Sequence, residues 1–273
     1  MLHKILKGVA PVVAMMLATG CNGNININGE DGVPLAELDM AGKTPTEIVA
    51  AGPDDVVVVR GDVLDIDVSG DREAVDALRF TLDEETLGVM RDSDWKDIDG
   101  KATVRVTLPR LEKLVLAGSG RAEVERLDGD AEVTIAGSGT ARAANVEASD
   151  LEVTIAGSGT FTAAGRARDL ELTIAGAGSA DMEGLTVERA EVSIAGSGDA
   201  AFASDGTVEA SIMGSGNVRV VGSARCTISS MGSGSLTCQA GTTTAAGGDG
   251  PPSPPEAPGT PSAPEAPQAP EEQ

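Results

Sequence analysis

Histidine and aromatic residues are nearly absent from this chain of 273 residues. The only histidine is His3, there is no tyrosine, and aromatic residues make up 1% of the sequence. Because His3 lies in a segment that we interpret below as a removed leader, the mature chain offers no imidazole for general-base catalysis or metal binding near neutral pH. Serine–histidine triads, histidine-ligated zinc and histidine-ligated haem are therefore excluded.

Basic residues are also few. The chain has 20 lysines and arginines against 43 aspartates and glutamates, which gives a formal net charge of −23. Proteins that bind nucleic-acid phosphates need positive charge instead. Stacking platforms for bases or sugars are scarce too, because the aromatic residues are Trp95, Phe80, Phe161 and Phe202 alone. We expect no nucleic-acid partner.

The first twenty residues resemble an export signal. A basic start with Lys4 and Lys7 precedes an apolar run from Gly8 to Leu17, which is shorter than the roughly 20 residues that a membrane-spanning helix needs. We therefore predict a signal peptide over residues 1–20 and an exported protein.

The end of this segment resembles a bacterial lipobox. It reads Ala18-Thr19-Gly20-Cys21, a run of small residues before a cysteine, and lipidation of Cys21 would anchor the protein to a membrane. Asn22 follows in place of the aspartate that marks inner-membrane retention, so the resemblance implies an outer-membrane lipoprotein. Because Ala18 replaces the usual leucine, ordinary cleavage with a free Cys21 stays open.

Two polar segments flank the rest of the chain. Residues 21–49 begin with an Asn/Gly-rich stretch and are predicted to be a flexible tether. Residues 242–273 form a tail that becomes rich in proline, alanine and glutamate from Gly250 onward. Such a composition favours disorder and extended polyproline II conformation, which fits a solvated spacer or a peptide ligand for a partner domain.

A repeated triplet dominates the region 117–241. Gly-Ser-Gly, or once Gly-Ala-Gly, recurs at intervals of 18 to 20 residues, and its first glycines are Gly118, Gly137, Gly157, Gly176, Gly196, Gly214 and Gly232. Between triplets, apolar and polar residues alternate, which is typical of β-strands. Two residues before the glycine, the rungs place Ile135, Ile155, Ile174, Ile194, Ile212 and Ser230 at one equivalent position.

These features predict an all-β fold, a parallel β-helix of about seven rungs. A rung of this length has no room for a helix, and stacked parallel strands would bury the aliphatic positions as continuous ladders. The glycines fit sharp corners that need a positive φ or close backbone stacking. Residues 50–116 contain further strand-like segments without the triplet, and we expect an irregular β-rich part that caps or leads into the solenoid: Val56–Val59, Leu64–Val68, Leu78–Leu82, Thr86–Arg91, Thr103–Leu108 and Leu111–Leu116.

The lead-in and the triplets together resemble a known bacterial family. Residues 104–112, Val-Arg-Val-Thr-Leu-Pro-Arg-Leu-Glu, precede Leu116-Ala117-Gly118-Ser119-Gly120 and the further triplets. This order is similar to that of the head GIN domain family of auto-transporter adhesins, over about residues 50 to 240. The resemblance implies a right-handed β-helical exported domain and supplies no catalytic residues.

One outward column of carboxylates is the main candidate for chemistry. Five residues before the corner glycine stand Glu132, Glu152, Glu171, Glu191 and Glu209. Neighbouring columns carry arginines, so a solvated and partly compensated face is one interpretation. Weak binding of Ca²⁺ or Mg²⁺ along the column is the other, because hard cations prefer oxygen ligands. We expect no other cofactor and assign no metal ligands.

Cys226 and Cys238 lie six residues before and six residues after Gly232, both at inward positions. Export makes a disulfide chemically feasible, and it would tie together the last rungs. Two buried thiols remain the alternative.

The sequence therefore predicts an exported, non-enzymatic β-solenoid that acts in adhesion or cell-envelope interaction through its elongated surface. The ligand would be a surface, a glycan or an envelope protein. A β-helical enzyme acting on polysaccharide and a passive, cation-binding envelope lipoprotein are the two alternatives.

Overall fold

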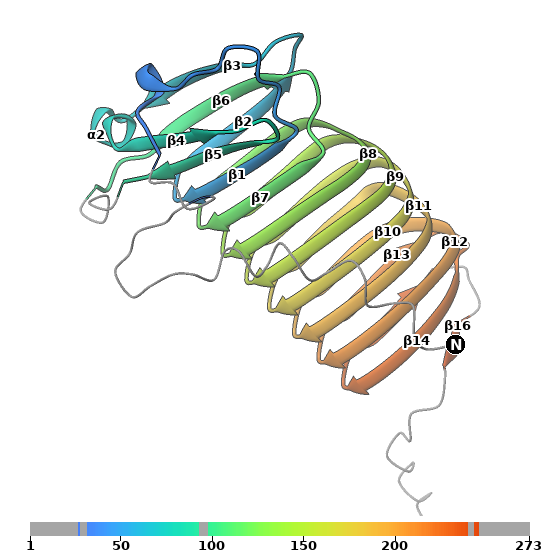
Figure 1. Ribbon diagram of the computed structural model, residues 1–273. Coiled ribbons are helices and arrows are strands. Elements are labelled where there is room, and N and C mark those ends of the chain that lie inside the picture. Colours follow the sequence, from blue (N-terminus) through green and yellow to red (C-terminus); the bar gives the residue numbers. More distant parts are fainter. Residues whose placement is uncertain (1–26, 28–31, 93–97, 240–242, 246–273) are drawn as a thin grey trace, which may run out of the picture.

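Long, bent strands form the regular part of the molecule. The computed structural model describes residues 27, 32–92, 98–239 and 243–245, so the expected signal peptide, Cys21 and nearly all of the expected tail lie outside the described residues. The chain is nearly all β and stacks into a parallel solenoid of about seven turns, which confirms the predicted fold class (Figure 1). The regular strands are β8 (Arg121–Gly137), β9 (Thr140–Gly157), β10 (Thr160–Gly176), β11 (Ser179–Gly196) and β12 (Asp199–Gly214).

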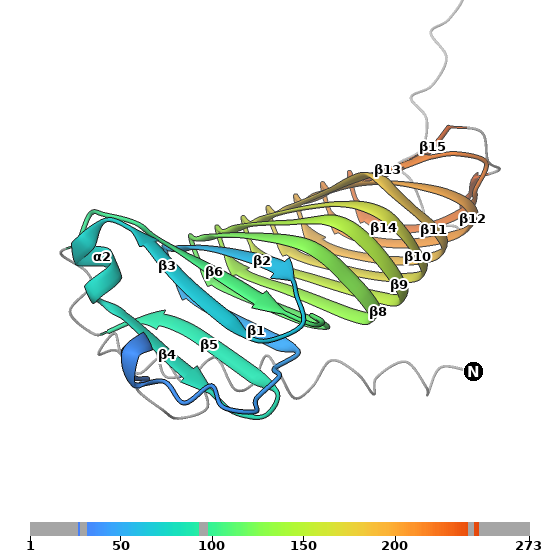
Figure 2. The same cartoon turned by 90° about the horizontal axis from the view of Figure 1, so that it is seen from above.

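Each long strand has two arms. The first arm follows a Gly-Ser-Gly corner, and the second arm runs to the glycine that opens the next corner. A short middle stretch joins the two arms, and the register between neighbouring rungs shifts on either side of it, for example between Ala163 and Gly165 on the side of the first arm and between Gly129 and Asp130 on the side of the second. Such irregularities bend a strand, and Figure 2 shows the bends aligned along one side of the solenoid.

The core consists of aliphatic ladders between the arms. Ile135, Ile155 and Ile174 are 0% exposed and pair in register from rung to rung. The opposite arm contributes a parallel column that holds mostly alanine but also Phe161 and Val218. Burial alternates along both arms as the period-two pattern predicts.

The first rungs are not stacked in chain order. β1 (Glu47–Gly52) pairs with both β5 (Thr86–Arg91) and β7 (Lys113–Gly118), while β2 (Asp55–Arg60) pairs with both β6 (Ala102–Leu108) and β8. The rung built from β5 and β6 therefore lies outside the rung built from β1 and β2. The chain then returns through β7 to the other side of β1 and begins the regular stack.

Antiparallel strands close this N-terminal end. β3 (Asp65–Gly70) pairs antiparallel with β6, and β4 (Leu78–Leu82) pairs antiparallel with β5. The short helix α2 (Arg72–Asp76) joins β3 to β4, and a 3₁₀ helix, η1 (Leu35–Glu37), lies near β4. Asp71 caps α2 by accepting a hydrogen bond from the backbone N–H of Glu73 at 3.0 Å.

β1 is a strand that the alternation of polar and apolar residues does not reveal. Its sequence Glu-Ile-Val-Ala-Ala-Gly is apolar at four consecutive positions, and all four are buried. The inward residues face the main core. The outward residues Val49 and Ala51 join a second small cluster with Met90, Val115 and Ile27 on the outside of the solenoid. Both faces of β1 are covered, so period two is lost.

The C-terminal rungs are shorter. β13 (Asn217–Val221) and β15 (Ser235–Cys238) continue the stack of first arms, and β14 (Arg225–Gly232) and β16 (Thr243–Ala245) continue the second arms. β16 falls inside the segment 242–273, for which the sequence indicates disorder. Within the described part of the chain, none of the helices is long and apolar enough to cross a membrane.

Candidate interaction surfaces

The glycine corners form a hydrogen-bonded stack. At the corner after β9, the backbone N–H of Ser158 donates to the carbonyl oxygen of Gly137 one rung below, at 2.9 Å. Gly157 has a φ of +123°, and a Cβ atom there would lie 2.4 Å from that same carbonyl oxygen. Gly159 is buried, and a Cβ atom there would lie 2.5 Å from a side-chain carbon of Ile135. Both glycines are thus required by the close stacking of backbones.

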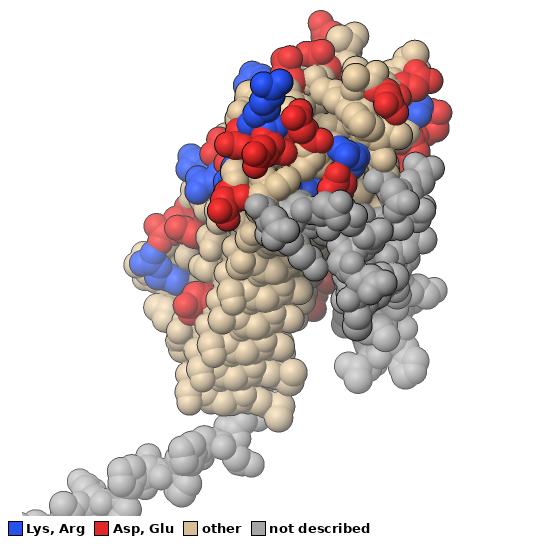
Figure 3. Space-filling view, turned by 90° about the vertical axis from the view of Figure 1, so that its left-hand side faces the viewer, with Lys and Arg blue, Asp and Glu red and all other residues tan. Residues whose placement is uncertain are grey.

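The corners and the outward residues beside them form a surface that we call the corner face. In the rungs from β8 to β14 it consists of three columns of small or uncharged side chains. Figure 3 looks onto this edge and shows a broad uncharged area over the stacked rungs, with acidic and basic side chains gathered above it. The columns are Thr134, Thr154, Thr173, Ser193, Ser211 and Ser229; Ala136, Ala156, Ala175, Ala195, Met213 and Met231; and Ser138, Ser158, Ala177, Ser197, Ser215 and Ser233.

The corner face becomes apolar toward the C-terminal end. Met213 and Met231 replace alanine in the last two rungs and are 56% and 74% exposed. They pair in register with each other. In a chain of which 23% of residues are charged, a charge-free face across six rungs is a feature that solubility alone does not explain.

The predicted glutamates stand side by side on the second arms. Strand register places Glu132, Glu152, Glu171, Glu191 and Glu209 in one column. The column extends further toward the N-terminal end, through Lys113 and Glu47, than the triplets alone indicate. Both residues stand five positions before a corner glycine, at Gly118 and Gly52, and this spacing could have found them.

Lysine neutralises only the start of this column. The Lys113 Nζ atom lies 3.2 Å from a carboxylate oxygen of Glu132 and 3.8 Å from one of Glu47. Burial raises the pKa of Glu152, and the neighbouring charges of Glu132 and Glu171 raise this pKa further, while the more distant Lys113 opposes the shift. The column therefore holds like charges close together on neighbouring rungs.

A groove of about 420 Å³ runs across four rungs beside the glutamates. In three of these rungs its lining follows one order along the strand, a polar residue, then a buried apolar residue, then a glutamate, and in the fourth it consists of Thr207 and Glu209. The first two such triplets are Asp150-Leu151-Glu152 and Asp169-Leu170-Glu171, and in the third Arg189 takes the polar position. Leu151, Leu170 and Ala190 are only 1%, 2% and 5% exposed and belong to the core, so the groove is bounded by a wall of glutamates and a wall of mixed charge and has no apolar floor.

Arginines compensate the mixed wall rather than the glutamate wall. Arg189 donates two hydrogen bonds to Asp169, at 2.5 and 2.7 Å, and Arg168 donates a third at 2.9 Å. These hydrogen bonds hold the pKa of Asp169 below its ordinary value. Arg168 also reaches Asp150 at 3.4 Å. The arginines of neighbouring columns therefore pair with aspartates and leave the glutamates to themselves.

A buried ion pair replaces the glycine corner at the N-terminal end. Asp54 follows the corner glycine Gly52, and Arg91 stands at the glycine position of the next rung outward. The Arg91 guanidinium donates to both Asp54 carboxylate oxygens at 2.6 Å, and the two side chains are 1% and 7% exposed. Arg91 also donates to the Gly100 carbonyl, and Asp54 accepts from the Ala102 N–H. The sequence does not predict this pair, because its members are 37 residues apart and belong to the irregular rungs.

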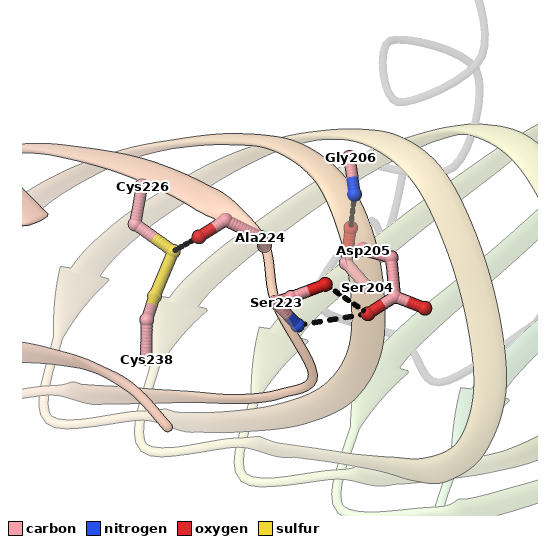
Figure 4. The surroundings of a disulfide bond; sticks show 7 residues. All are labelled: Ser204, Asp205, Gly206, Ser223, Ala224, Cys226 and Cys238. Carbon is pink, nitrogen blue, oxygen red and sulfur yellow. Dashed lines mark hydrogen bonds between the residues drawn. A yellow bond between two sulfur atoms is a disulfide. The ribbon is translucent and has the colours of Figure 1, made fainter. Parts of the chain in front are cut away.

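Cys226 and Cys238 form a disulfide in the structure, with a Cα–Cα distance of 6.8 Å. Cys226 begins the second arm of the last full rung and is 0% exposed, and Cys238 ends β15 on the opposite arm (Figure 4). Beside the bond, Asp205 accepts hydrogen bonds from the backbone N–H and the hydroxyl of Ser223, each at 2.8 Å, which lower the pKa of Asp205. The disulfide joins the two arms where the stack ends.

Among the described residues, no group of three or more histidine, cysteine, aspartate or glutamate side chains is arranged to hold a metal ion. Cys21, the predicted lipidation site, lies outside those residues.

The stacked parallel rungs, the hydrogen-bonded glycine corners and the long outward columns define this chain as a parallel β-solenoid protein with an extended repetitive surface. The chain belongs to the family described as "Putative auto-transporter adhesin, head GIN domain", whose model matches residues 44–224. The family resemblance drawn from the sequence is thereby confirmed.

Solved structures show the same fold. A crystal structure of an adhesin-like protein from Bacteroides fragilis is 21% identical, covers 72% of this chain and 93% of its own, and has a TM-score of 0.65. A protein named as a lipid-binding protein from Parabacteroides distasonis is 20% identical with the same coverages and a TM-score of 0.56. An adhesin-like protein from the same organism is 21% identical, again with these coverages, and has a TM-score of 0.58. No curated protein matches the chain.

Proposed function

We propose that this protein is a non-enzymatic, exported adhesion or cell-envelope interaction module that binds through its corner face. Family membership and the adhesin names of two structural relatives support a surface role. The observation that carries the proposal is the charge-free, repetitive corner face on a strongly acidic molecule. Small, uncharged side chains favour flat contact with another surface, because no charged group has to lose its hydration when the two surfaces meet.

The lipobox-like segment supports a membrane attachment at Cys21, and Asn22 supports the outer membrane as its location. Anchoring there would hold the solenoid at the cell envelope, where it meets surfaces, glycans and envelope proteins.

Charge introduced into the corner face tests the proposal. Full-length protein immobilised on beads is incubated with bacterial cells, isolated envelopes and a glycan array. We expect Ala156→Glu and Ala195→Glu to abolish retention, because each places a carboxylate in the middle of the uncharged face. The control is Ala144→Glu, at an exposed position on a first arm away from this face. Retention that is equal in all three variants would contradict the proposal.

The polysaccharide-enzyme alternative makes a different prediction. It requires release of a soluble product, and a single carboxylate-to-amide change such as Glu152→Gln would abolish that release. The passive cation-binding alternative predicts neither retention on a surface nor product release.

A further inference from the structure

The columns of the corner face continue into the first rungs, where the chain itself covers them. In register with Thr134 stand Val115 on β7, Val49 on β1 and Gly88 on β5. The side chain of Ile27 lies over this part of the face, is 7% exposed and packs in one cluster with Val49 and Val115. The N-terminal end of the corner face is therefore apolar and occupied by a segment that precedes the whole solenoid in the chain.

The site that holds Ile27 is shaped for it. A Cβ atom at Gly88 would lie 2.9 Å from the Cδ1 atom of Ile27 and 2.2 Å from the Oγ1 atom of Thr81, so a side chain there would displace Ile27. Six residues further along, Val33 exchanges two backbone hydrogen bonds with Phe80, each at 2.8 Å. We call Ile27 together with the cluster and the glycine notch that hold it the clasp.

The clasp limits the reach of anything attached to Cys21. Cys21 precedes Ile27 by six residues, and an extended chain spans at most about 3.5 Å per residue, so Cys21 lies within about 20 Å of the clasp. The column that starts at Ala117 on β7 pairs rung by rung as far as Met231 on β14. At the strand spacing of about 4.8 Å, this column is about 30 Å long. The reach from the clasp is therefore shorter than the solenoid.

We propose that the clasp positions the protein on a lipid surface. It holds a lipid anchor at Cys21 beside the first rungs, so that the N-terminal end of the solenoid lies next to the membrane and Met213 and Met231 lie farthest from it. The net charge of −23 favours this orientation, because anionic headgroups repel the molecule and keep it from lying flat. The proposal rests on the proposed lipidation of Cys21 and adds which end faces the membrane.

Energy transfer to the membrane tests this placement. The full-length protein, purified from membranes with its acyl chains, is reconstituted in vesicles of phosphatidylethanolamine and phosphatidylglycerol whose headgroups carry an acceptor dye. A donor dye is attached either to Glu84→Cys, at the exposed turn between β4 and β5, or to Met231→Cys in β14. We expect transfer from position 84 to be at least about threefold stronger, because the far end of the corner face is about 30 Å further away.

Opening the clasp should remove this difference. In Ile27→Asn the chain is held only from Val33 onward, twelve residues after Cys21, which doubles the reach to about 40 Å and lets either end approach the lipid. We expect the ratio of the two transfer signals to fall by about half or more. The matched control Val63→Asn makes the same kind of change at a side chain that is 68% exposed and should keep the ratio of the parent.

Two results of the transfer experiment would overturn the proposal. Equal transfer from both donor positions in the acylated parent would contradict the placement of the N-terminal end at the membrane. A ratio that Ile27→Asn leaves unchanged would contradict the role of the clasp. Thermal unfolding of each variant checks that the fold is intact.

Two further measurements separate failure of the clasp from failure of the proposed function. Mass spectrometry of the mature protein tests the anchor, and an unmodified Cys21 would overturn the membrane attachment and the placement with it. Amide exchange at Val33 in the unacylated variant Cys21→Ser tests the clasp alone. It should become faster when Ile27→Asn is added, because the docked side chain holds this segment against β4, and unchanged exchange would show that no clasp forms. Retention in the bead assay reports separately on the corner face.

Discussion

The single residues that this fold depends on most are those at the corners. A corner glycine combines a positive φ with contact to the backbone of the rung below, as Gly157 does with the carbonyl oxygen of Gly137. The serine between the glycines is exposed and carries no such constraint. Backbone geometry therefore determines the two glycines of the triplet. It does not determine the serine between them, whose side chain forms part of the outer surface.

Substitution of one corner glycine should be costly. We expect Gly157→Ala to lower the free energy of unfolding by at least about 2 kcal/mol, because the added Cβ atom meets backbone and the residue must keep a strained φ. Urea denaturation followed by circular dichroism measures this change. Ser158→Ala should stay within about 0.5 kcal/mol of the parent, and an equal effect of both variants would contradict this account of the corner.

The buried pair of Asp54 and Arg91 should behave differently from the exposed pairs. We expect Asp54→Ala to destabilise the fold by about 3–5 kcal/mol, because it leaves the Arg91 guanidinium buried without its counter-charge. Asp150→Ala removes one of the two surface partners of Arg168 and should change stability by less than about 1 kcal/mol. A double variant, Asp54→Leu/Arg91→Met, should recover part of the loss in the same denaturation experiment.

At the scale of strands, the regular rungs follow from the sequence, whereas for the first rungs the sequence predicts the strands β2 to β7 but neither β1 nor the order in which they stack. The triplets and the alternation around Ile155 and Ile174 place the corners and inward columns of β8 to β12. β1 could not be predicted from alternation, because both of its faces are buried and its polar and apolar residues do not alternate. The placement of β5 outside β1 depends on pairing between segments that are distant in the chain, and no local pattern encodes it. The glutamate column was predictable by counting from the glycines, whereas the groove depends on how the arms bend.

The glutamate column should make stability depend on pH. The pKa of Glu152 is raised in the folded state, so folding disfavours its charged form and stability increases as the pH falls through the raised value. We expect Glu152→Gln to be more stable than the parent at pH 7, with a difference that disappears in mildly acid solution where both side chains are neutral. Urea midpoints of parent and variant between pH 4 and pH 8 measure this. Glu123→Gln, which removes a carboxylate from an exposed position on a first arm away from the column, is the control for the change in net charge. A difference between parent and Glu152→Gln that grew on acidification would refute the explanation.

At the scale of the whole molecule, the two ends of the solenoid are protected by different means. β3, β4 and α2 cover the N-terminal end. At the other end, β15 and β16 have four and three residues, and the disulfide joins the arms. Because each rung contacts only its neighbours, opening should begin at the less protected end and spread inward.

Reduction of the disulfide should therefore act locally. Closing a loop of this length contributes about 3 kcal/mol in the chain-entropy estimate, so we expect amide hydrogen exchange in β14 and β15 to become about a hundredfold faster after reduction. Amides of β9 should be unaffected. Mass spectrometry with and without reductant verifies the bond, and exchange that accelerates equally along the whole solenoid would contradict local opening.

The displaced order of the first rungs also bears on synthesis. A nascent chain emerges from its N-terminus, but β1 obtains its two neighbours only after residues 86–91 and 113–118 have followed it. Until then β1, whose four central residues are all apolar and buried in the finished fold, lacks both neighbours. Afterwards every further 18 to 20 residues complete one more rung on a finished template. The slow, chaperone-sensitive stage of folding should therefore end while nearly all of the Gly-Ser-Gly rungs are still to be made, and the remaining rungs should add in one direction.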